Sequence, residues 1–471
     1  MMPPAAPAPP APPAPVPART RPTLRQHVAV WYGIVGVPAI WAAHVLFCQT
    51  LAATACAGGV PERNGEPWPV VHWTLALACA GAFALALTGA LLARRTWRES
   101  AAINTPQRAP FGPIYASNIT PEPVHGIGEY TPAQFAGALQ RGVARDGKRL
   151  YPAMPYPSFA ALHASDVNAL YQYFMYGVKP VPNAAPPTRL PFPFNQRWVM
   201  LYWRLAFARH GRFEPDPAHS AQWNRGAWLV QGLGHCGACH TPRGPAYNEM
   251  GYTQSSPLYL TGGVTDHWYA PNLTGDPGSG LGRWSAGDIA AFLRDGHNDR
   301  AYAFDAMAPV VGASTPYLGD DDLLAIAAYL KSLPAREASG QYAESAAARA
   351  STMAALHDGT PERPGAGLYL SYCAKCHGAD GAGKPDKAPP LAGSSLALSP
   401  DATSVLRLIV EGSQSPQAGN GGTPRKMPAF RTQLTGSEIA QVASFVRGAW
   451  GNNAAPIAPA EVTRLREAIH R

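Results

Sequence analysis

The sequence has few charged residues and very little lysine. Charged residues make up 14% of the chain, against the roughly 25% that is usual for soluble domains, and seven of the 38 basic residues are lysine. The formal net charge of +8 is a modest surplus over 471 residues, which is weak evidence for nucleic-acid binding. A hydrophobic share of 46% excludes a highly charged disordered protein. We expect no nucleic-acid partner.

The number of cysteines is odd, and we do not expect the first residues to be a signal peptide. Seven cysteines cannot form a complete intramolecular disulfide framework. Ten of the 50 prolines lie in residues 1–22, so residues 1–27 are predicted to form an extended, disordered Pro/Ala tail. The apolar stretch that follows is too long to be the hydrophobic region of a signal peptide. No flavin, quinone or nucleotide motif is visible, and we predict no catalytic residue.

Two long runs without Asp, Glu, Lys or Arg follow the tail. Val28–Ala52 has 25 residues and His72–Ala93 has 22. Each is long enough to cross a bilayer core of about 30 Å at 1.5 Å per residue; buried core helices are the alternative. Aromatic residues stand near the ends of the runs, as at membrane interfaces: Trp31, Tyr32, Trp68 and Trp73. We therefore expect a transmembrane helical hairpin over residues 28–96, with a short loop around Gly58–Pro69.

The rest of the chain divides into three globular blocks. They cover residues 101–195, 215–340 and 355–455, and stretches rich in proline or small residues join them. The first two blocks contain an internal repeat. From both Asn118 and Asn272, a Gly-x-Gly sequence begins 8 residues later and another glycine follows at 24 residues.

Each repeat then continues in the same order. A methionine follows the asparagine, at 36 residues for Met154 and 35 residues for Met307. An apolar-periodic segment comes next, at 166–174 in the first block and 320–333 in the second, and this spacing predicts helices. We therefore expect an all-α protein.

Two motifs give the strongest chemical signal. They are Cys236-Gly237-Ala238-Cys239-His240 and Cys373-Ala374-Lys375-Cys376-His377. Each is a CxxCH sequence, which is typical of c-type haem attachment. Two thiols at this spacing on a helix can form thioethers to both vinyl groups of one porphyrin, and the adjacent histidine then faces the iron. A zinc site or a redox dithiol is the alternative, but two motifs, each beginning a domain-sized block, favour two covalently bound haem c groups.

Each haem iron also needs a ligand on its other face. Met307 lies 67 residues after His240, and Met427 lies 50 residues after His377. Both are expected in loops with a proline one or two residues further on, before the last helix of their block. A lone methionine is often a core residue, but these positions favour axial ligation. An iron held by histidine on one face and methionine on the other has no open site, which favours electron transfer over oxygen or peroxide chemistry.

At this point residues 101–455 resemble a known family. They are similar to the cytochrome c subunit of membrane-bound bacterial alcohol, gluconate and aldehyde dehydrogenases. The matching stretches are PFGPIYASNITPEPVHGIGEYTPAQF, LYPAMPYPSF, GAWLVQGLGHCGACHTPRG, APNLTGDPGSGLGRWSAGDIAAFLRDG and GLYLSYCAKCHGADG. The resemblance implies tandem cytochrome c domains in the periplasm, which take electrons from a partner dehydrogenase subunit and pass them to ubiquinone or a terminal oxidase.

The sequence departs from that family in its number of haem motifs. The family has three, whereas this chain has two. The repeat places a third motif near residue 85, where there is no CxxCH, so Met154 has no anchored porphyrin to face. An empty porphyrin site of roughly 400 Å³ would cost on the order of 10 kcal/mol. We therefore expect residues 101–195 to be a degenerate cytochrome c-like block that is collapsed, partly disordered or packed on its neighbour.

The remaining cysteines lie in or beside the apolar runs. They are Cys48, Cys56 and Cys79, which we interpret as small buried hydrophobic residues. A non-covalent haem between His44 and His72 is an alternative to packed or interfacial histidines. Four of the seven lysines surround the last haem motif or its methionine: Lys375, Lys384, Lys387 and Lys426. They are either ordinary solvated charges or a positive ring that steers an acidic partner to the last haem, which would then be the exit for electrons.

Two lines of sequence evidence disagree on topology. Arginines precede the first apolar run and follow the second, so the positive-inside rule places both flanks in the cytoplasm. Haem attachment by CxxCH normally takes place outside it. Giving the haem motifs more weight, we expect a membrane-anchored dihaem cytochrome in the bacterial inner membrane, with its haem domains facing the periplasm. The alternatives are a haem enzyme of the dihaem peroxidase type and a non-functional fusion product.

Overall fold

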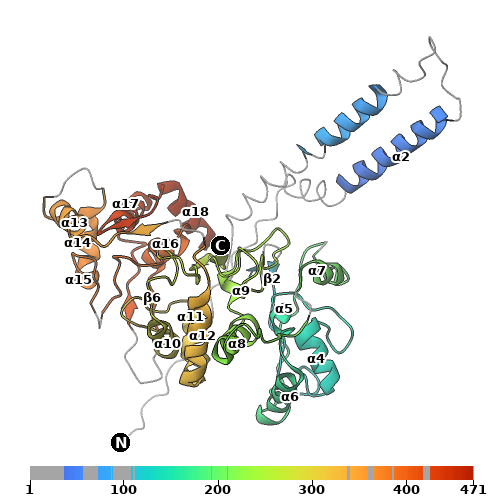
Figure 1. Cartoon of the computed structure of the whole chain (residues 1–471), viewed down its shortest axis with the longest axis horizontal. Helices are drawn as coiled ribbons and strands as arrows, with labels where there is room; N and C mark the ends of the chain where they lie inside the picture. The colour runs from blue at the N-terminus through green and yellow to red at the C-terminus, as the bar shows by residue number, and fades with distance from the viewer. Residues whose placement is uncertain are drawn as a thin grey trace, which may run out of the picture. The chain divides into compact units, whose positions relative to one another are not determined.

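The structure is a computed structural model of the chain, and most of its regular elements are helices (Figure 1). It divides into two units, residues 1–103 with Arg471, and residues 104–470. The described residues are 37–56, 73–85, 87–88, 108–109, 112–192, 194–208, 211–336, 340–358, 364–384, 387–416 and 425–469. The predicted tail over residues 1–27, the predicted loop at Gly58–Pro69 and His72 lie outside them.

The N-terminal unit contains two helices side by side (Figure 1). Helix α2 covers Val37–Cys56, and the second helical segment covers 73–85. The expectation of a transmembrane hairpin over residues 28–96 is wrong: in the described part of the chain, no helix is long and apolar enough to cross a membrane. Helix α2 also includes the polar residues His44 and Gln49.

The sequence repeat corresponds to a repeated structure. Helix α4 (Pro132–Arg141) and helix α10 (Ala286–Asp295) each begin with a capping box. The side chain of the residue before the helix accepts a hydrogen bond from the backbone N–H three residues later, and the side chain of that later residue accepts one from the backbone N–H of the first. Each ends at a glycine in the left-handed region, Gly142 at φ 61° and Gly296 at φ 73°. A side chain there would be strained, which explains the shared glycine at offset 24.

The asparagine that opens each repeat organises the turn before these helices. The Oδ1 atom of Asn118 accepts from the Thr120 N–H at 2.9 Å, and that of Asn272 accepts from the Thr274 N–H at 2.7 Å. Their Nδ2 groups each donate to a distant backbone carbonyl, that of Val181 in the first repeat and that of Arg336 in the second, both at 2.8 Å. The same residue types therefore close the same loop twice.

The first and second blocks share one hydrophobic core. Phe135, Leu162 and Tyr171 of the first block are buried in the same cluster as Trp228 and Leu330 of the second. Of the three outcomes expected for residues 101–195, the structure shows packing on the neighbouring block. The elements of this part are α5 (Tyr156–Phe159), α6 (Ala164–Gln172), the π-helical turn Tyr173–Gly177, α7 (Val199–Phe207), α8 (Ala221–Trp228), the π-helical turn Leu229–Leu233, α9 (Gly237–His240), α11 (Met307–Ala313), the 3-10 turn Thr315–Tyr317 and α12 (Asp320–Ser332).

The third block has a core of its own. Tyr369, Ile439 and Trp450 lie at its centre, each fully buried. Six helices surround it: α13 (Ala346–Asp358), α14 (Ala366–Tyr372), α15 (Ala374–His377), α16 (Thr403–Glu411), α17 (Gly436–Gly448) and α18 (Pro459–Ile469). This core extends past both predicted limits of the third block, 355 and 455, because α13 begins at Ala346 and α18 ends at Ile469.

Strand structure in the described residues is confined to four short antiparallel pairs. They are β1 (Arg108–Ala109) with β2 (Gly112–Pro113), β3 (Gly263–Thr265) with β4 (Trp268–Ala270), β5 (Gln341–Tyr342) with β8 (Asn452–Asn453), and β6 (Ser413–Gln414) with β7 (Lys426–Met427). Strand β4 also joins the second block to the third. The Ser404 hydroxyl of α16 accepts from the Tyr269 N–H at 2.8 Å and donates to the Tyr269 carbonyl at 3.0 Å, and these bonds are buried.

Replacing Gly226 by alanine tests the tight packing of α8 on α12. A Cβ at this position would lie 1.9 Å from the Ala325 carbonyl oxygen, so the two helices would have to separate. We expect Gly226→Ala to lower the free energy of unfolding by about 1–3 kcal/mol, measured by chemical denaturation of the haem-loaded protein.

The matched control for this substitution is Gly367→Ala in helix α14. A Cβ there would meet nothing within 4 Å, and alanine is the better helix former by up to about 1 kcal/mol. An unfolding free energy that is equal in the two variants would contradict the close contact between α8 and α12.

Candidate haem sites

The first CxxCH motif forms a single helical turn. Cys236 immediately precedes helix α9, and its carbonyl accepts from the His240 N–H at 3.0 Å. Cys236 is half-buried and packs against the shared core, whereas Cys239 is exposed. The turn therefore places one thiol toward the core and the other toward the outside, with the histidine one turn beyond the first thiol.

The second motif repeats this turn in the third block. Cys373 immediately precedes helix α15, and its carbonyl accepts from the His377 N–H at 3.0 Å. Cys373 is half-buried and Cys376 exposed, as in the first motif. Helix α14 ends just before the motif, and its buried Tyr369 donates a hydrogen bond to the Gly378 carbonyl just after it, at 2.5 Å. The motif is therefore held on both sides.

Both histidine rings are oriented by a proline carbonyl. Nδ1 of His240 lies 2.7 Å from the Pro271 oxygen, and Nδ1 of His377 lies 2.9 Å from the Pro389 oxygen. Because a carbonyl oxygen only accepts, each Nδ1 carries the proton and each Nε2 carries a lone pair. Burial lowers the pKa of both histidines. Each ring is thus a neutral imidazole with Nε2 prepared to bind a metal ion.

The thiols of these motifs are not prepared for dithiol redox chemistry. Burial raises the pKa of Cys236 and of Cys373 to about 12, whereas redox thiols react as thiolates. In the part of the chain that the structure describes, neither motif belongs to a group of three or more Cys, His, Asp or Glu side chains that meet at one point. Two thiols followed directly by a histidine are the groups that covalent haem attachment uses, so the donor set fits covalent haem better.

A buried donor beside the first motif supports the same conclusion. The indole N–H of Trp268 in β4 is buried and has no acceptor among the described residues. An unsatisfied buried donor costs about 1–3 kcal/mol. The Arg407 guanidinium lies over the same indole ring, 4.4 Å from its centre. The Arg407 guanidinium already pairs with Glu411, Nε to Oε2 at 2.6 Å, so the indole N–H is the group that lacks a partner, and a haem propionate is an acceptor of the kind that it needs.

The predicted distal methionines differ in where the structure places them. Met427 lies in β7 and packs against the third-block core, as Cys373 does. Met307 is half-buried at the start of α11, and among the described residues it is not part of the cluster against which Cys236 packs. Met154 occupies the position that matches Met307, since the N–H of each donates to the carbonyl three residues before it. Their roles as ligands remain predictions.

Sequence reasoning missed a buried acid beneath helix α9. Glu249 is 7% exposed, and its Oε1 lies 4.0 Å from an Arg243 guanidinium nitrogen. The contact is too long for a full ion pair, and burial raises the pKa of Glu249 to about 7. No motif marks a lone glutamate of this kind, because its burial depends on the backbone path of residues distant in the sequence, such as Tyr259.

The comparisons with known proteins agree with this geometry. Residues 224–334 match the family described as "Cytochrome c", and residues 360–446 match "Cytochrome C oxidase, cbb3-type, subunit III". The chain is 43% identical to the alcohol dehydrogenase (quinone) cytochrome c subunit of Gluconacetobacter polyoxogenes over 366 residues, 76% of this chain and 77% of that protein. These matches confirm the resemblance drawn from the sequence.

Two further relatives extend the comparison. The chain is 42% identical to the gluconate 2-dehydrogenase cytochrome c subunit of Pantoea cypripedii, over 77% of this chain and 83% of the relative. It is 41% identical to a diheme cytochrome c-type protein of Cereibacter sphaeroides, over 48% of this chain and 74% of the relative. The segments that carry the two CxxCH motifs are therefore cytochrome c segments.

The raised pKa of Glu249 predicts a pH dependence of stability. The folded state holds this proton up to about pH 7, whereas an ordinary glutamate releases it near 4.5. The folded protein therefore binds more protons than the unfolded chain in this window, so its stability falls as the pH rises, by at most about 1.4 kcal/mol per pH unit. We expect Glu249→Gln to flatten this decline between pH 4.5 and 7, measured by chemical denaturation.

The control is Glu467→Gln, which changes an exposed glutamate of helix α18. That variant should keep the wild-type pH profile. If Glu249→Gln loses stability with rising pH as steeply as the wild type, the carboxyl of Glu249 is not the group responsible.

Proposed function

The chain belongs to the family of cytochrome c subunits of alcohol and gluconate dehydrogenases, and on this premise we propose that it is a dihaem cytochrome that passes electrons from a partner dehydrogenase subunit to ubiquinone or a terminal oxidase. Cys236 and Cys239 anchor one haem c, and Cys373 and Cys376 anchor the other. The observation that carries the proposal is the repeated CxxCH turn, in which a carbonyl orients the histidine ring for metal binding.

The protein's own groups hold each iron in one coordination state. Nε2 of His240 and of His377 would bind the two irons, and the hydrogen bond from Nδ1 keeps the ring from rotating and makes Nε2 more basic. Met307 and Met427 would each supply a thioether sulfur as a further ligand, which would raise the reduction potential. Bound haem c supplies a one-electron Fe(III)/Fe(II) couple. Two axial ligands leave no place for peroxide, so this assignment favours electron transfer over a peroxidase.

The contact between the second and third blocks supports transfer within the chain. Besides the bonds between Tyr269 and Ser404, the Arg407 guanidinium donates to the Asp266 carbonyl at 2.6 Å. The Ser395 hydroxyl donates to the Gly280 carbonyl at 3.0 Å. Backbone groups of the second block are thus tied to side chains of the third. These hydrogen bonds between the blocks would keep the distance between two bound haems constant. A constant rate of electron transfer between the haems requires a constant distance.

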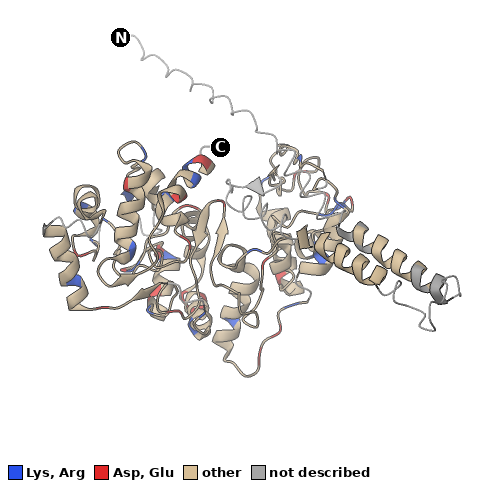
Figure 2. Cartoon of the chain, turned by 90° about the horizontal axis from the view of Figure 1, so that it is seen from above, with Lys and Arg blue, Asp and Glu red and all other residues tan. Residues whose placement is uncertain are grey.

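The lysines of the third block support the docking of an acidic partner there. Basic residues are scattered along the described elements (Figure 2). Around the last motif, however, four lysines are all exposed: Lys375, Lys384, Lys387 and Lys426. Exposed positive charge around one haem would steer an acidic acceptor to it. The third-block haem is therefore proposed as the exit. Because CxxCH attachment takes place outside the cytoplasm, the haem domains are proposed to work in the periplasm.

Counting covalent haem tests the cofactor assignment. We expect two haems per wild-type chain, and one each in Cys236→Ser/Cys239→Ser and in Cys373→Ser/Cys376→Ser, because each motif anchors its own porphyrin. The measurements are a pyridine haemochrome assay against protein concentration and haem staining after denaturing electrophoresis. Cys79→Ser, which keeps both motifs, is the control. A colourless protein, or pigment that organic solvent extracts, would refute covalent attachment.

Replacing the methionines tests the axial ligands. Met427→Leu keeps the volume but removes the sulfur, so we expect loss of the weak red absorption band of methionine-ligated ferric haem from one haem, and a lower potential for that haem. Met307→Leu should do the same to the other haem. Met154→Leu is the matched control and should leave the spectrum unchanged. A spectrum altered by Met154→Leu would show that the first block contributes a ligand.

A further inference from the structure

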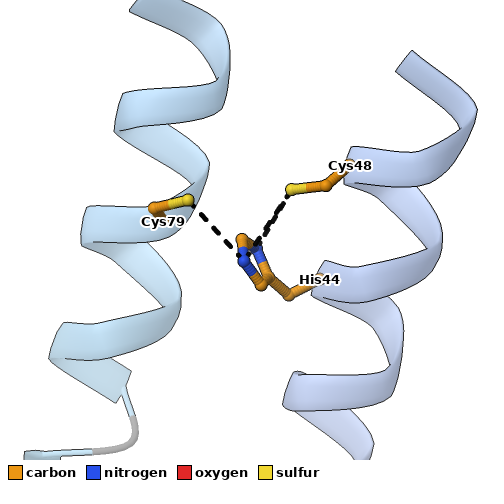
Figure 3. A group of neighbouring side chains, drawn as sticks. All are labelled: His44, Cys48 and Cys79. Atoms are coloured by element: carbon orange, nitrogen blue, oxygen red, sulfur yellow. Dashed lines mark hydrogen bonds between the residues drawn. The ribbon is translucent and has the colours of Figure 1, made fainter. Parts of the chain in front are cut away.

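The N-terminal unit contains a second group of metal-binding side chains, which the haem function does not use. His44 and Cys48 come from helix α2, and Cys79 comes from the helical segment 73–85 (Figure 3). All three ligand atoms lie within 4.8 Å of one another. Among the described residues, this is the one group of three or more His, Cys, Asp or Glu side chains that can meet at a point.

Helix geometry brings two of the three ligands together. His44 and Cys48 are four residues apart, so they lie on the same face of α2 one turn from each other. Figure 3 shows both side chains pointing toward the second helix, from which Cys79 points back at the imidazole. The interpretation of the cysteines as small buried hydrophobic residues is wrong for Cys79, which is exposed. An apolar role therefore does not account for its position.

The distances match the edges of a metal coordination polyhedron. Nε2 of His44 lies 3.7 Å from the sulfur of Cys48 and 3.7 Å from the sulfur of Cys79. Zinc bonds of about 2.3 Å to sulfur and 2.0–2.1 Å to nitrogen give a nitrogen–sulfur edge of roughly 3.6 Å at the tetrahedral angle. The three atoms can therefore bind one ion with only a small adjustment of side chains.

We propose that His44, Cys48 and Cys79 form a binding site for Zn²⁺. Two sulfur ligands and one imidazole are the donors that zinc and copper(I) prefer, and calcium and magnesium require oxygen ligands instead. The apolar runs around the three residues contain no Asp, Glu, Lys or Arg. Two thiolates neutralise the charge of Zn²⁺, whereas with copper(I) they leave a net negative charge that is costly in apolar surroundings. Charge balance therefore favours zinc.

The exposure of Cys79 accounts for the fourth zinc ligand. Zinc in proteins takes four ligands, and a site with three protein ligands takes water as the fourth. Cys79 lies on the exposed side of the group, whereas His44 and Cys48 are half-buried, so water has access to that position. Zinc there would link α2 to the segment 73–85 and stabilise the pair of helices in proportion to its occupancy.

Zinc content and the zinc absorption edge test this site in the intact, haem-loaded chain under reducing conditions. After equilibration with Zn²⁺ and gel filtration, we expect about one zinc per chain. X-ray absorption at the zinc edge, which the haem iron does not disturb, should show two sulfur atoms at about 2.3 Å and nitrogen or oxygen at about 2.0–2.1 Å. Cys48→Ser, Cys79→Ser and His44→Ala should each weaken zinc binding at least 100-fold, beyond the roughly 10–100-fold of outer-shell changes.

Two further variants separate loss of a ligand from loss of folding. Cys48→His keeps a zinc ligand on the same face and should retain zinc within about 10-fold of the wild type. Cys56→Ser removes a thiol of the same helix while keeping all three proposed ligands, and should bind zinc as the wild type does. Both should keep two covalent haems, so failure of the zinc site is distinguishable from failure of the haem function.

Three results would overturn the proposal. The first is a wild-type chain that binds no zinc although it is reduced and haem-loaded. The second is zinc bound without sulfur neighbours, or bound equally by Cys48→Ser and the wild type. The third is a wild-type chain that binds zinc no more tightly than His44→Ala does.

Discussion

The hydrogen bond from a histidine ring to a proline carbonyl determines how each CxxCH motif can work. The motif alone supplies two thiols and an imidazole on one turn of helix, but it does not decide which ring nitrogen faces outward. The carbonyls of Pro271 and Pro389 decide it, since each accepts a hydrogen bond from Nδ1 and so keeps the proton on that nitrogen. Both prolines lie on loops well removed from their motif in sequence, so the rest of each block serves to bring that carbonyl to the ring.

The sequence was sufficient to predict features that depend on local pattern. The CxxCH turns, the helix at Asp320 and the repeated glycines Gly142 and Gly296 follow from spacing, capping and backbone strain, which act over a few residues. The transmembrane hairpin was a wrong prediction, because an absence of charge marks apolar composition but does not give the length of a helix. The meeting of Cys79 with His44 could not be predicted, since 35 residues separate them.

The burial of single polar groups could not be predicted from the sequence either. Glu249 and Trp268 carry no motif, and their burial depends on the folded structure. Glu249 is buried beneath helix α9 with its Oε1 4.0 Å from an Arg243 guanidinium nitrogen, and Arg407 of the third block covers the Trp268 ring. A buried charge or hydrogen-bond donor is tolerated only where a partner group offsets the cost of its burial. These two residues therefore indicate which partner groups surround the haem motif.

The first block shows how a cytochrome c-like unit can persist without its motif. A porphyrin normally fills the centre of such a block, and an empty site would cost about as much as the whole stability of a small domain. Here Leu162 and Phe135 are buried in the core of the second block, and Tyr156 packs edge-to-face on Trp203 of helix α7. The Trp203 indole in turn donates to the Ala246 carbonyl of the second block. The first block therefore gains from its neighbour the burial that a haem would provide, and its loss would expose the core against which Cys236 packs.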